Sequence, residues 1–167
     1  WAMAAAQCLG GVPVPMYQDA PANEFVYVLN DAAIRYAIVE DQEQVDKLIE
    51  VRPQCAQLAR IWFDDPRGLR NYSEPGLAPL DALIEQGRQF NAQQPAVVDE
   101  AIAQNRPGDV AAMFFTSGTT GNPKGVVHTH ASLIDRARAG AEFDKLTERE
   151  EVLAYLPPAW IGQNIFS

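Results

Sequence analysis

The sequence predicts an α/β fold with a mainly parallel sheet and flanking helices. Short apolar runs of strand length alternate with longer segments whose apolar residues recur at helical spacing, which is typical of β-α-β units. Such crossovers are right-handed and join parallel strands. The chain has 167 residues, of which 47% are apolar, and this suits a globular domain with a core of its own. We therefore expect one domain or part of one.

The first two thirds of the chain contain most of the predicted elements. Helical periodicity ended by glycine or proline predicts helices over 1–9, 22–33, 42–51, 80–91 and 98–104. Apolar runs predict strands over 12–16, 36–40 and 58–63. The two prolines in 12–16 would suit a strand end or edge, and the Gly, Pro and Asn content of 67–79 predicts a loop.

The last third continues the alternation. Apolar runs predict strands over 110–115, 125–129 and 151–156, and an apolar stripe predicts a helix over 131–146. The charged run 147–151 is interpreted as a solvated turn.

The most unusual stretch is F-T-S-G-T-T-G-N-P-K-G at 115–125. Its glycines allow close approach of the backbone to an anion, its hydroxyl groups add donors, and Lys124 supplies a mobile positive charge. It follows the strand 110–115, and ligands of open α/β sheets lie outside the carboxyl ends of strands. This pattern indicates a loop that cradles phosphate groups.

Two known phosphate motifs are excluded by spacing. A Walker A loop requires G-x-x-x-x-G-K-[ST], whereas Asn122 and Pro123 separate Gly121 from Lys124 here. The dinucleotide fingerprint G-x-G-x-x-G opening a helix is absent as well. From composition alone, a Gly/Thr-rich hairpin connection remains an alternative, because the same residues dominate turns.

The segment T-S-G-T-T-G-N-P-K-G at 116–125 resembles the signature loop of the adenylate-forming superfamily, which includes acyl-CoA synthetases, luciferases and the adenylation domains of peptide synthetases. Residues 1–20 and the segment after Pro157 also resemble family motifs, most closely those of long-chain acyl-CoA synthetases. The resemblance implies that the loop holds the β- and γ-phosphates of ATP, with Lys124 also offsetting charge on the leaving pyrophosphate. The implied phosphate contacts are Thr116, Ser117, Gly118, Thr119, Thr120, Gly121 and Lys124.

The resemblance further implies an ATP-dependent carboxylate–CoA ligase that uses ATP, Mg²⁺ and CoA. A fatty or related carboxylic acid would form an acyl-adenylate, and the CoA thiol would then displace AMP. Trp160 stands where the family commonly has histidine, and it suits a gate over a hydrophobic acyl tail, with packing in the core as the alternative. Three other readings stay open: a non-catalytic nucleotide-binding module, an adenylating enzyme for an aromatic or amino acid, and a plain α/β interaction domain.

The resemblance also sets the expected domain organisation. Residues 1–167 would be part of the large N-terminal AMP-binding domain, with a helix and strand portion over 1–108 and a phosphate-loop portion over 109–167. The first helix starts without a capping residue and the last apolar run stops without a terminator, so we expect a fragment that is inactive by itself. The ribose, adenine and Mg²⁺ ligands and the C-terminal lysine domain would lie beyond Ser167.

Composition excludes several other classes. The net charge of −9 and the pI near 4.6 argue against a nucleic-acid partner. His128 and His130 would share a face if both lay on the strand, although His130 could also flank the following helix; no third ligand is evident, so we predict no metal site. Cys8 and Cys55 suit buried thiols and not a disulfide framework. No apolar run reaches the roughly 18 residues of a membrane span and no signal peptide is evident, so we expect a cytoplasmic protein; peripheral membrane association stays open.

Overall fold

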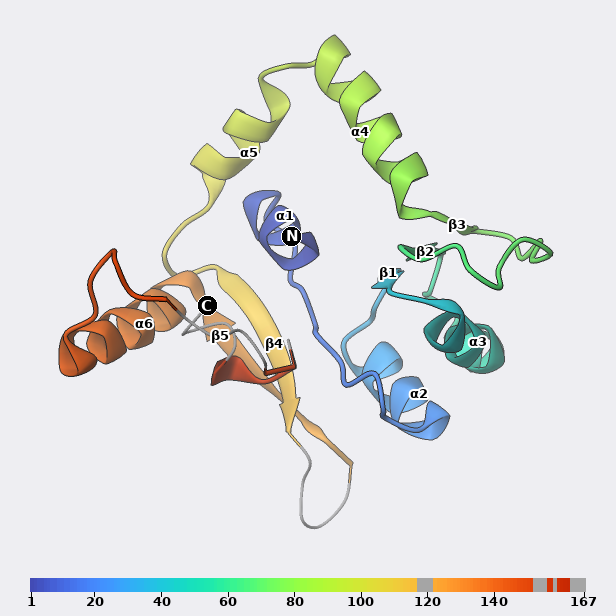
Figure 1. The fold of residues 1–167 in the computed structure, drawn as a ribbon, viewed down its shortest axis with the longest axis horizontal. Helices are drawn as coiled ribbons and strands as arrows, with labels where there is room; N and C mark the ends of the chain where they lie inside the picture. Colours follow the sequence, from blue (N-terminus) through green and yellow to red (C-terminus); the bar gives the residue numbers. More distant parts are fainter. Residues whose placement is uncertain (117–121, 152–155, 158, 163–167) are drawn as a thin grey trace. The chain divides into compact units, whose positions relative to one another are not determined.

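The computed structural model describes residues 1–116, 122–151, 156–157 and 159–162 (Figure 1). The chain divides into two compact units, Gln18–Val97 and a second one made of Trp1–Tyr17 with Val98–Ser167. We call the first the parallel-sheet unit and the second the hairpin unit.

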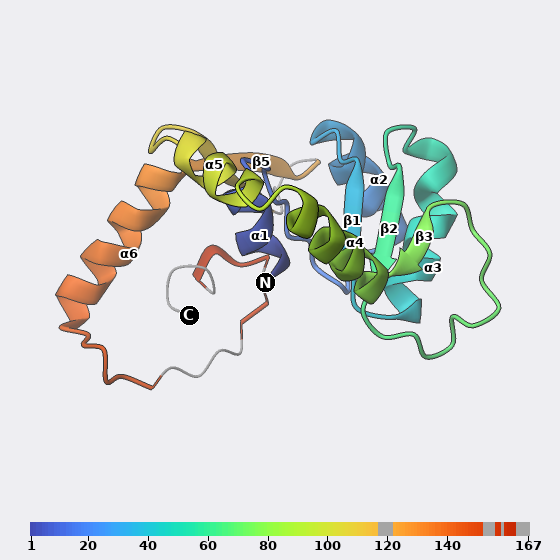
Figure 2. The same ribbon diagram turned by 90° about the horizontal axis from the view of Figure 1, so that it is seen from above.

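The parallel-sheet unit contains three strands, β1 (Tyr36–Val39), β2 (Arg60–Phe63) and β3 (Leu77–Pro79), in the order β1-β2-β3. Both pairings are parallel, with Tyr36 opposite Arg60 and Ile61 opposite Leu77. Figure 2 shows the three strands side by side. The α/β class with a mainly parallel sheet is thereby confirmed.

One helical crossover joins β1 to β2: α3 (Gln42–Val51) with the short 3-10 helix η1 (Arg52–Gln54). The helix α2 (Ala22–Asp31) precedes β1, α4 (Leu80–Gln93) follows β3, and a loop joins β2 to β3. Asp41 caps α3, since its Oδ1 accepts a hydrogen bond of 3.2 Å from the Gln44 N–H. The helix then ends just before Pro53, as its sequence predicts.

The core of the parallel-sheet unit comes from helical positions three or four apart. α2 buries Phe25, Val28 and Leu29, and α3 buries Val45, Leu48 and Val51. From the sheet, β2 adds Ile61 and Phe63, and Ile61 is 0% exposed. Complete burial of one such side chain contributes roughly 1.5–3 kcal/mol, so this apolar stripe dominates the stability of the unit.

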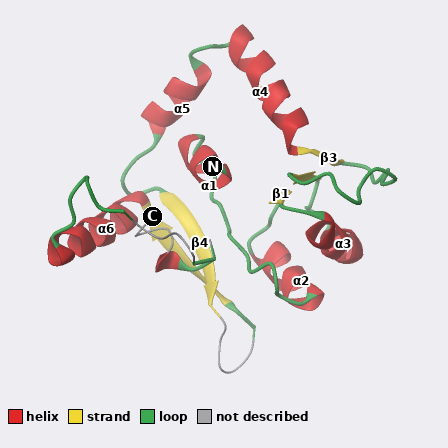
Figure 3. Cartoon of the chain, in the orientation of Figure 1, coloured by secondary structure: helices red, strands yellow, loops and turns green. Residues whose placement is uncertain are grey.

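The hairpin unit contains α1 (Ala2–Cys8), most of α5 (Val97–Gln104), the strands β4 (Val110–Thr116) and β5 (Lys124–Thr129), and α6 (His130–Asp144). β4 and β5 pair antiparallel, and Figure 3 shows them as adjacent yellow arrows. α1 ends at the predicted Gly10-Gly11 pair: Gly10 has φ +72°, and the Gly11 N–H donates to the Ala6 carbonyl at 2.7 Å. This is the pattern of a Schellman cap.

Two sequence predictions of strands and loops are wrong. Residues 12–16 form no strand, because Pro13 and Pro15 have no N–H with which to complete a ladder. The predicted loop 67–79 ends in β3, three residues that become a strand only because β2 provides their pairing partner.

The predicted strand over 151–156 falls mostly on residues outside the described set. Within the described set, no helix is long and apolar enough to cross a membrane.

Candidate functional site

The β4–β5 hairpin carries the candidate site, and the signature segment joins its two strands. Thr116 ends β4 and Lys124 begins β5, and the two residues are directly paired. The Thr116 hydroxyl donates to the Lys124 carbonyl at 3.5 Å. The predicted contacts between them, Ser117, Gly118, Thr119, Thr120 and Gly121, lie outside the described residues. The structure thus brings the first and last predicted phosphate contacts together.

The antiparallel pairing refines the sequence interpretation of this loop. The hairpin alternative is correct as to topology, since residues 117–123 connect two antiparallel neighbours. A hairpin connection and an anion-binding loop do not exclude each other, because the same glycines and hydroxyls serve both.

The donor groups at the hairpin end fit a polyphosphate. Lys124 is exposed, and within the described part of the chain no carboxylate lies within ion-pairing distance of its ammonium. Thr116 is exposed too and presents a hydroxyl at the same end of the hairpin. An unpaired ammonium beside a hydroxyl suits the charge and geometry of phosphate oxygens.

A packed base supports this end of the hairpin. Ala111 and Ala112 are 0% exposed and Phe114 is 5% exposed. Gly125 has a packing reason beside its expected ligand role: a Cβ there would lie 2.9 Å from the Met113 sulfur and 3.2 Å from the Phe115 ring. A side chain at Gly125 would therefore force the Met113 and Phe115 side chains to shift.

Of the two placements that the sequence left open for His130, the one at the following helix is correct, and a strand face shared with His128 is wrong. His128 lies on β5 and meets the Phe114 ring edge-on, with centroids 5.7 Å apart, whereas His130 is the first residue of α6. Thr129 caps α6, exchanging hydrogen bonds of 3.2 and 3.0 Å with Ser132. The described residues hold no group of three or more His, Cys, Asp or Glu that could bind a metal.

The N-terminus of α6 is likewise satisfied by the protein itself. The His130 N–H donates to the Asp109 carbonyl at 3.1 Å, and the Ala131 N–H donates to the Pro107 carbonyl at 2.8 Å. These bonds tie the end of β5 to the start of β4 and leave the opposite, looped end of the hairpin as the place for a ligand.

Trp160 lies in the short described segment 159–162, where its side chain is 49% exposed. The backbone N–H of Trp160 donates to the Pro157 carbonyl at 2.9 Å. At this exposure the indole is not packed in a core, which was the alternative prediction for Trp160. Its role beside an acyl tail stays a prediction.

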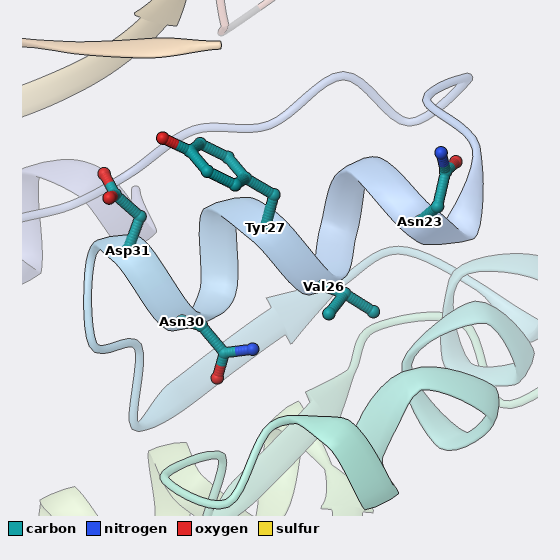
Figure 4. Close-up of a pocket in the computed structure, with 5 residues that line it drawn as sticks. All are labelled: Asn23, Val26, Tyr27, Asn30 and Asp31. Atoms are coloured by element: carbon teal, nitrogen blue, oxygen red, sulfur yellow. The ribbon is translucent and has the colours of Figure 1, made fainter. Parts of the chain in front are cut away.

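A hollow on the parallel-sheet unit lies along α2 and is lined by Asn23, Val26, Tyr27, Asn30 and Asp31 (Figure 4). All five residues come from this single helix. The Asn30 amide already donates to the Gln54 carbonyl at 3.0 Å. The hollow carries one carboxylate and no cation, so it does not suit a phosphate.

A second hollow lies where β1 and β2 end, which is the usual ligand position in an open α/β sheet. It is lined by Asp41, Gln42, Glu43, Asp65, Arg67 and Gly68. Arg67 Nε donates to Asp65 at 2.6 Å, and this bond raises the pKa of the guanidinium and lowers the pKa of the Asp65 carboxyl. Because its one cation is already paired and its other charged side chains are all acidic, this hollow does not suit a phosphate.

Sequence reasoning missed the residues that hold β4 from its other side. Gln7 donates through its side chain to the Ala111 carbonyl at 2.9 Å, and Asn105 donates to the carbonyls of Gln7 and Cys8. About a hundred residues separate the partners along the chain, and no local pattern signals such a contact.

Comparison with known proteins adds three findings. The family described as "AMP-binding enzyme" matches residues 1–166. The long-chain-fatty-acid–CoA ligase ACSBG2 of Xenopus laevis is 29% identical over 162 residues, which is 93% of this chain and 21% of that protein. The chain thus spans about a fifth of the length of this relative.

Solved structures agree. The N-terminal domain of FACL13 from Mycobacterium tuberculosis superposes with a TM-score of 0.66 at 25% identity, covering 96% of this chain and 36% of that one. The long-chain-fatty-acid-CoA ligase FadD1 from Archaeoglobus fulgidus gives a TM-score of 0.68 at 19% identity, covering 98% of this chain and 29% of that one. Because the sequence identities are low, these superpositions establish the fold and no finer property.

Proposed function

Because the chain belongs to the AMP-binding enzyme family, we propose that its intact gene product is an ATP-dependent carboxylate–CoA ligase that releases AMP. The observation that carries the proposal is the family match over 1–166, with the signature segment held between the paired ends of β4 and β5. The fold is part of the large N-terminal domain of adenylate-forming enzymes. Relatives named as long-chain-fatty-acid–CoA ligases favour a fatty acid as the substrate.

The proposed chemistry has two steps. A carboxylate oxygen attacks the α-phosphorus of ATP, so that an acyl-adenylate forms and pyrophosphate leaves; the CoA thiol then attacks the acyl carbon and AMP leaves. In the first step negative charge grows on the pyrophosphate, and an ammonium and a hydroxyl group beside it lower the barrier. Lys124 and Thr116 are the described residues assigned to this role, together with Ser117, Gly118, Thr119, Thr120 and Gly121 in the loop.

The remaining assignments follow from the same proposal. Trp160 borders the acyl tail, where its half-exposed indole offers a large apolar face. Mg²⁺ would accompany ATP, and no described residue is assigned to bind the metal, the ribose or the adenine. We propose a cytoplasmic enzyme whose AMP-binding domain includes a helix and strand portion over 1–108 and the phosphate-loop portion over 109–167.

The test is ATP–pyrophosphate exchange by the intact gene product with fatty, aromatic and amino acids in parallel. We expect exchange above background with fatty acids, followed by CoA-dependent release of AMP. Exchange with only aromatic or amino acids would show that the substrate belongs to that class and is not a fatty acid. Folded protein that exchanges with no acid would refute the ligase proposal. Nucleotide binding without exchange would identify a non-catalytic binding module.

A matched pair of variants tests the role of Lys124. Lys124→Ala should lower kcat/KM for exchange about 10²-fold, the usual effect of removing one charge-stabilising donor. Lys145→Ala serves as the control, because Lys145 is an exposed lysine at the far end of α6. Equal kcat/KM values in the two variants would show that Lys124 does not contact the phosphates.

A further inference from the structure

β4 is the strand that leads to the candidate site, and its pairing with β5 is irregular near its first residues. Val110 pairs with Thr129 and Ala112 pairs with His128, so Ala111 is an extra residue with no partner in β5. Such a β-bulge shifts the register of everything beyond it by one residue. The pairing of Thr116 with Lys124 at the far end of β4 therefore depends on the bulge staying at Ala111.

The bulge is held from the edge of β4 that β5 leaves open. Gln7 Nε2 donates to the Ala111 carbonyl at 2.9 Å, and the Met113 N–H donates to the Pro13 carbonyl at 3.1 Å. Pro13 and Pro15 can accept hydrogen bonds but cannot donate them. The Gln7 amide thus supplies a donor that the adjoining proline-rich segment lacks.

Gln7 is itself fixed by its surroundings. It lies in the last turn of α1, and Asn105 Nδ2 donates to its carbonyl at 3.1 Å and to the Cys8 carbonyl at 3.2 Å. The Schellman cap at Gly10 closes the same turn. Since these contacts fix the backbone from which the side chain extends, its amide meets Ala111 in one defined geometry.

We propose that Gln7 is a positioning residue for the phosphate-binding hairpin. Its hydrogen bond holds the bulge at Ala111 and thereby the register in which Thr116 faces Lys124. A slip of one residue would turn the Thr116 side chain to the opposite face of the hairpin. The kinetic part of this inference rests on the proposed ligase function, and its structural part does not.

The experiment replaces Gln7 by methionine in the intact gene product, which keeps the length of the side chain and removes the donor. Gln89→Met is the matched control, because the Gln89 amide donates to Glu85 at 3.0 Å on the exposed surface of α4, away from the hairpin in sequence. We expect Gln7→Met to raise the KM for ATP and for pyrophosphate about tenfold, the effect of leaving one buried carbonyl without its donor, and to leave the KM for the carboxylic acid within about twofold.

Hydrogen–deuterium exchange of the peptide covering residues 110–116 provides a readout that does not depend on activity. Gln7→Met should exchange about tenfold faster there than wild type and Gln89→Met. If the wild-type protein shows no ATP–pyrophosphate exchange, the ligase proposal fails, and deuterium exchange alone then decides whether Gln7 holds β4.

Two results would overturn the inference. One is unchanged deuterium exchange over 110–116 in Gln7→Met, and the other is a parallel rise in KM for ATP and acid, which would indicate general destabilisation. Should Gln7→Met not fold, the isosteric Gln7→Glu, whose carboxylate cannot donate, takes its place with the same expected shifts.

Discussion

The same substitution at two glycines, Gly76 and Gly87, is predicted to have opposite effects on stability. Gly76 precedes β3 with φ +81°, and an alanine Cβ there would lie 2.6 Å from the Ala59 carbonyl oxygen. Gly87 lies in the middle of α4, where an added Cβ would meet nothing within 4 Å. Gly76→Ala should weaken the β2–β3 pairing, whereas Gly87→Ala should strengthen α4.

The magnitudes follow from the local geometry. At Gly76 the left-handed backbone costs an alanine about 1–2 kcal/mol, and displacing a backbone oxygen adds about 1–3 kcal/mol. The lower entropy of the unfolded alanine chain offsets about 0.4–1 kcal/mol, which leaves a destabilisation of about 3 kcal/mol. At Gly87 the gain in helix propensity is about 0.5–1 kcal/mol.

Hydrogen–deuterium exchange of the intact gene product measures both changes, since local opening sets the exchange rate of each segment. The Ile61 N–H donates to the Gly76 carbonyl at 2.9 Å, so the β2 peptide reports on Gly76→Ala. It should exchange about 10²-fold faster, and the α4 peptide of Gly87→Ala should exchange about two- to fivefold more slowly. Changes of the same sign in the two variants would refute the reasoning.

Three further predictions concern other parts of the chain. Thr129→Ala removes the capping box of α6 and should destabilise its first turn by about 1 kcal/mol, seen as faster amide exchange there; unchanged exchange would contradict the cap. Iodoacetamide should alkylate Cys8 well before Cys55, because Cys55 is 2% exposed and burial raises the pKa of its thiol; mass spectrometry showing the reverse order would speak against the packing. Tyr72 donates a hydrogen bond to Asp46 at 2.7 Å, and this bond raises the pKa of the phenol. The stability that the bond contributes is therefore complete below the ordinary tyrosine pKa of about 10 and is lost as pH rises through the higher pKa of the folded state. Urea midpoints of Tyr72→Phe should lack this alkaline decline, and a decline equal to that of wild type would assign it to another group.

Helices were predictable because their signals are local. The bounds of α3 match the predicted range 42–51, since Asp41, the apolar spacing of Val45 and Leu48, and Pro53 all lie within a single stretch of sequence. The predicted helix over 131–146 corresponds to α6 within one or two residues at each end. Here the sequence also contained the cap in Thr129, which sequence reasoning passed over.

Strands were less predictable because a strand needs a partner elsewhere. Residues 12–16 are apolar enough for a strand but lack backbone donors at Pro13 and Pro15, whereas Leu77–Pro79 is short and proline-ended and is still a strand. The neighbouring edge decides between them: β2 pairs with β3, while the open edge of β4 meets Pro13, which accepts a hydrogen bond from Met113 and cannot return one.

The signature segment at 116–125 indicated the family through its resemblance to the family's phosphate loop, and the family match over 1–166 confirms it. The sequence by itself also determined the α/β class, because short apolar runs alternate along it with segments whose apolar residues recur at helical spacing. Only the tertiary structure decided that β4 and β5 pair antiparallel, that Ala111 forms a bulge, and that Gln7 holds it. The last of these facts depends on a hydrogen bond between residues about a hundred positions apart, and such a contact forms only when the whole chain has folded.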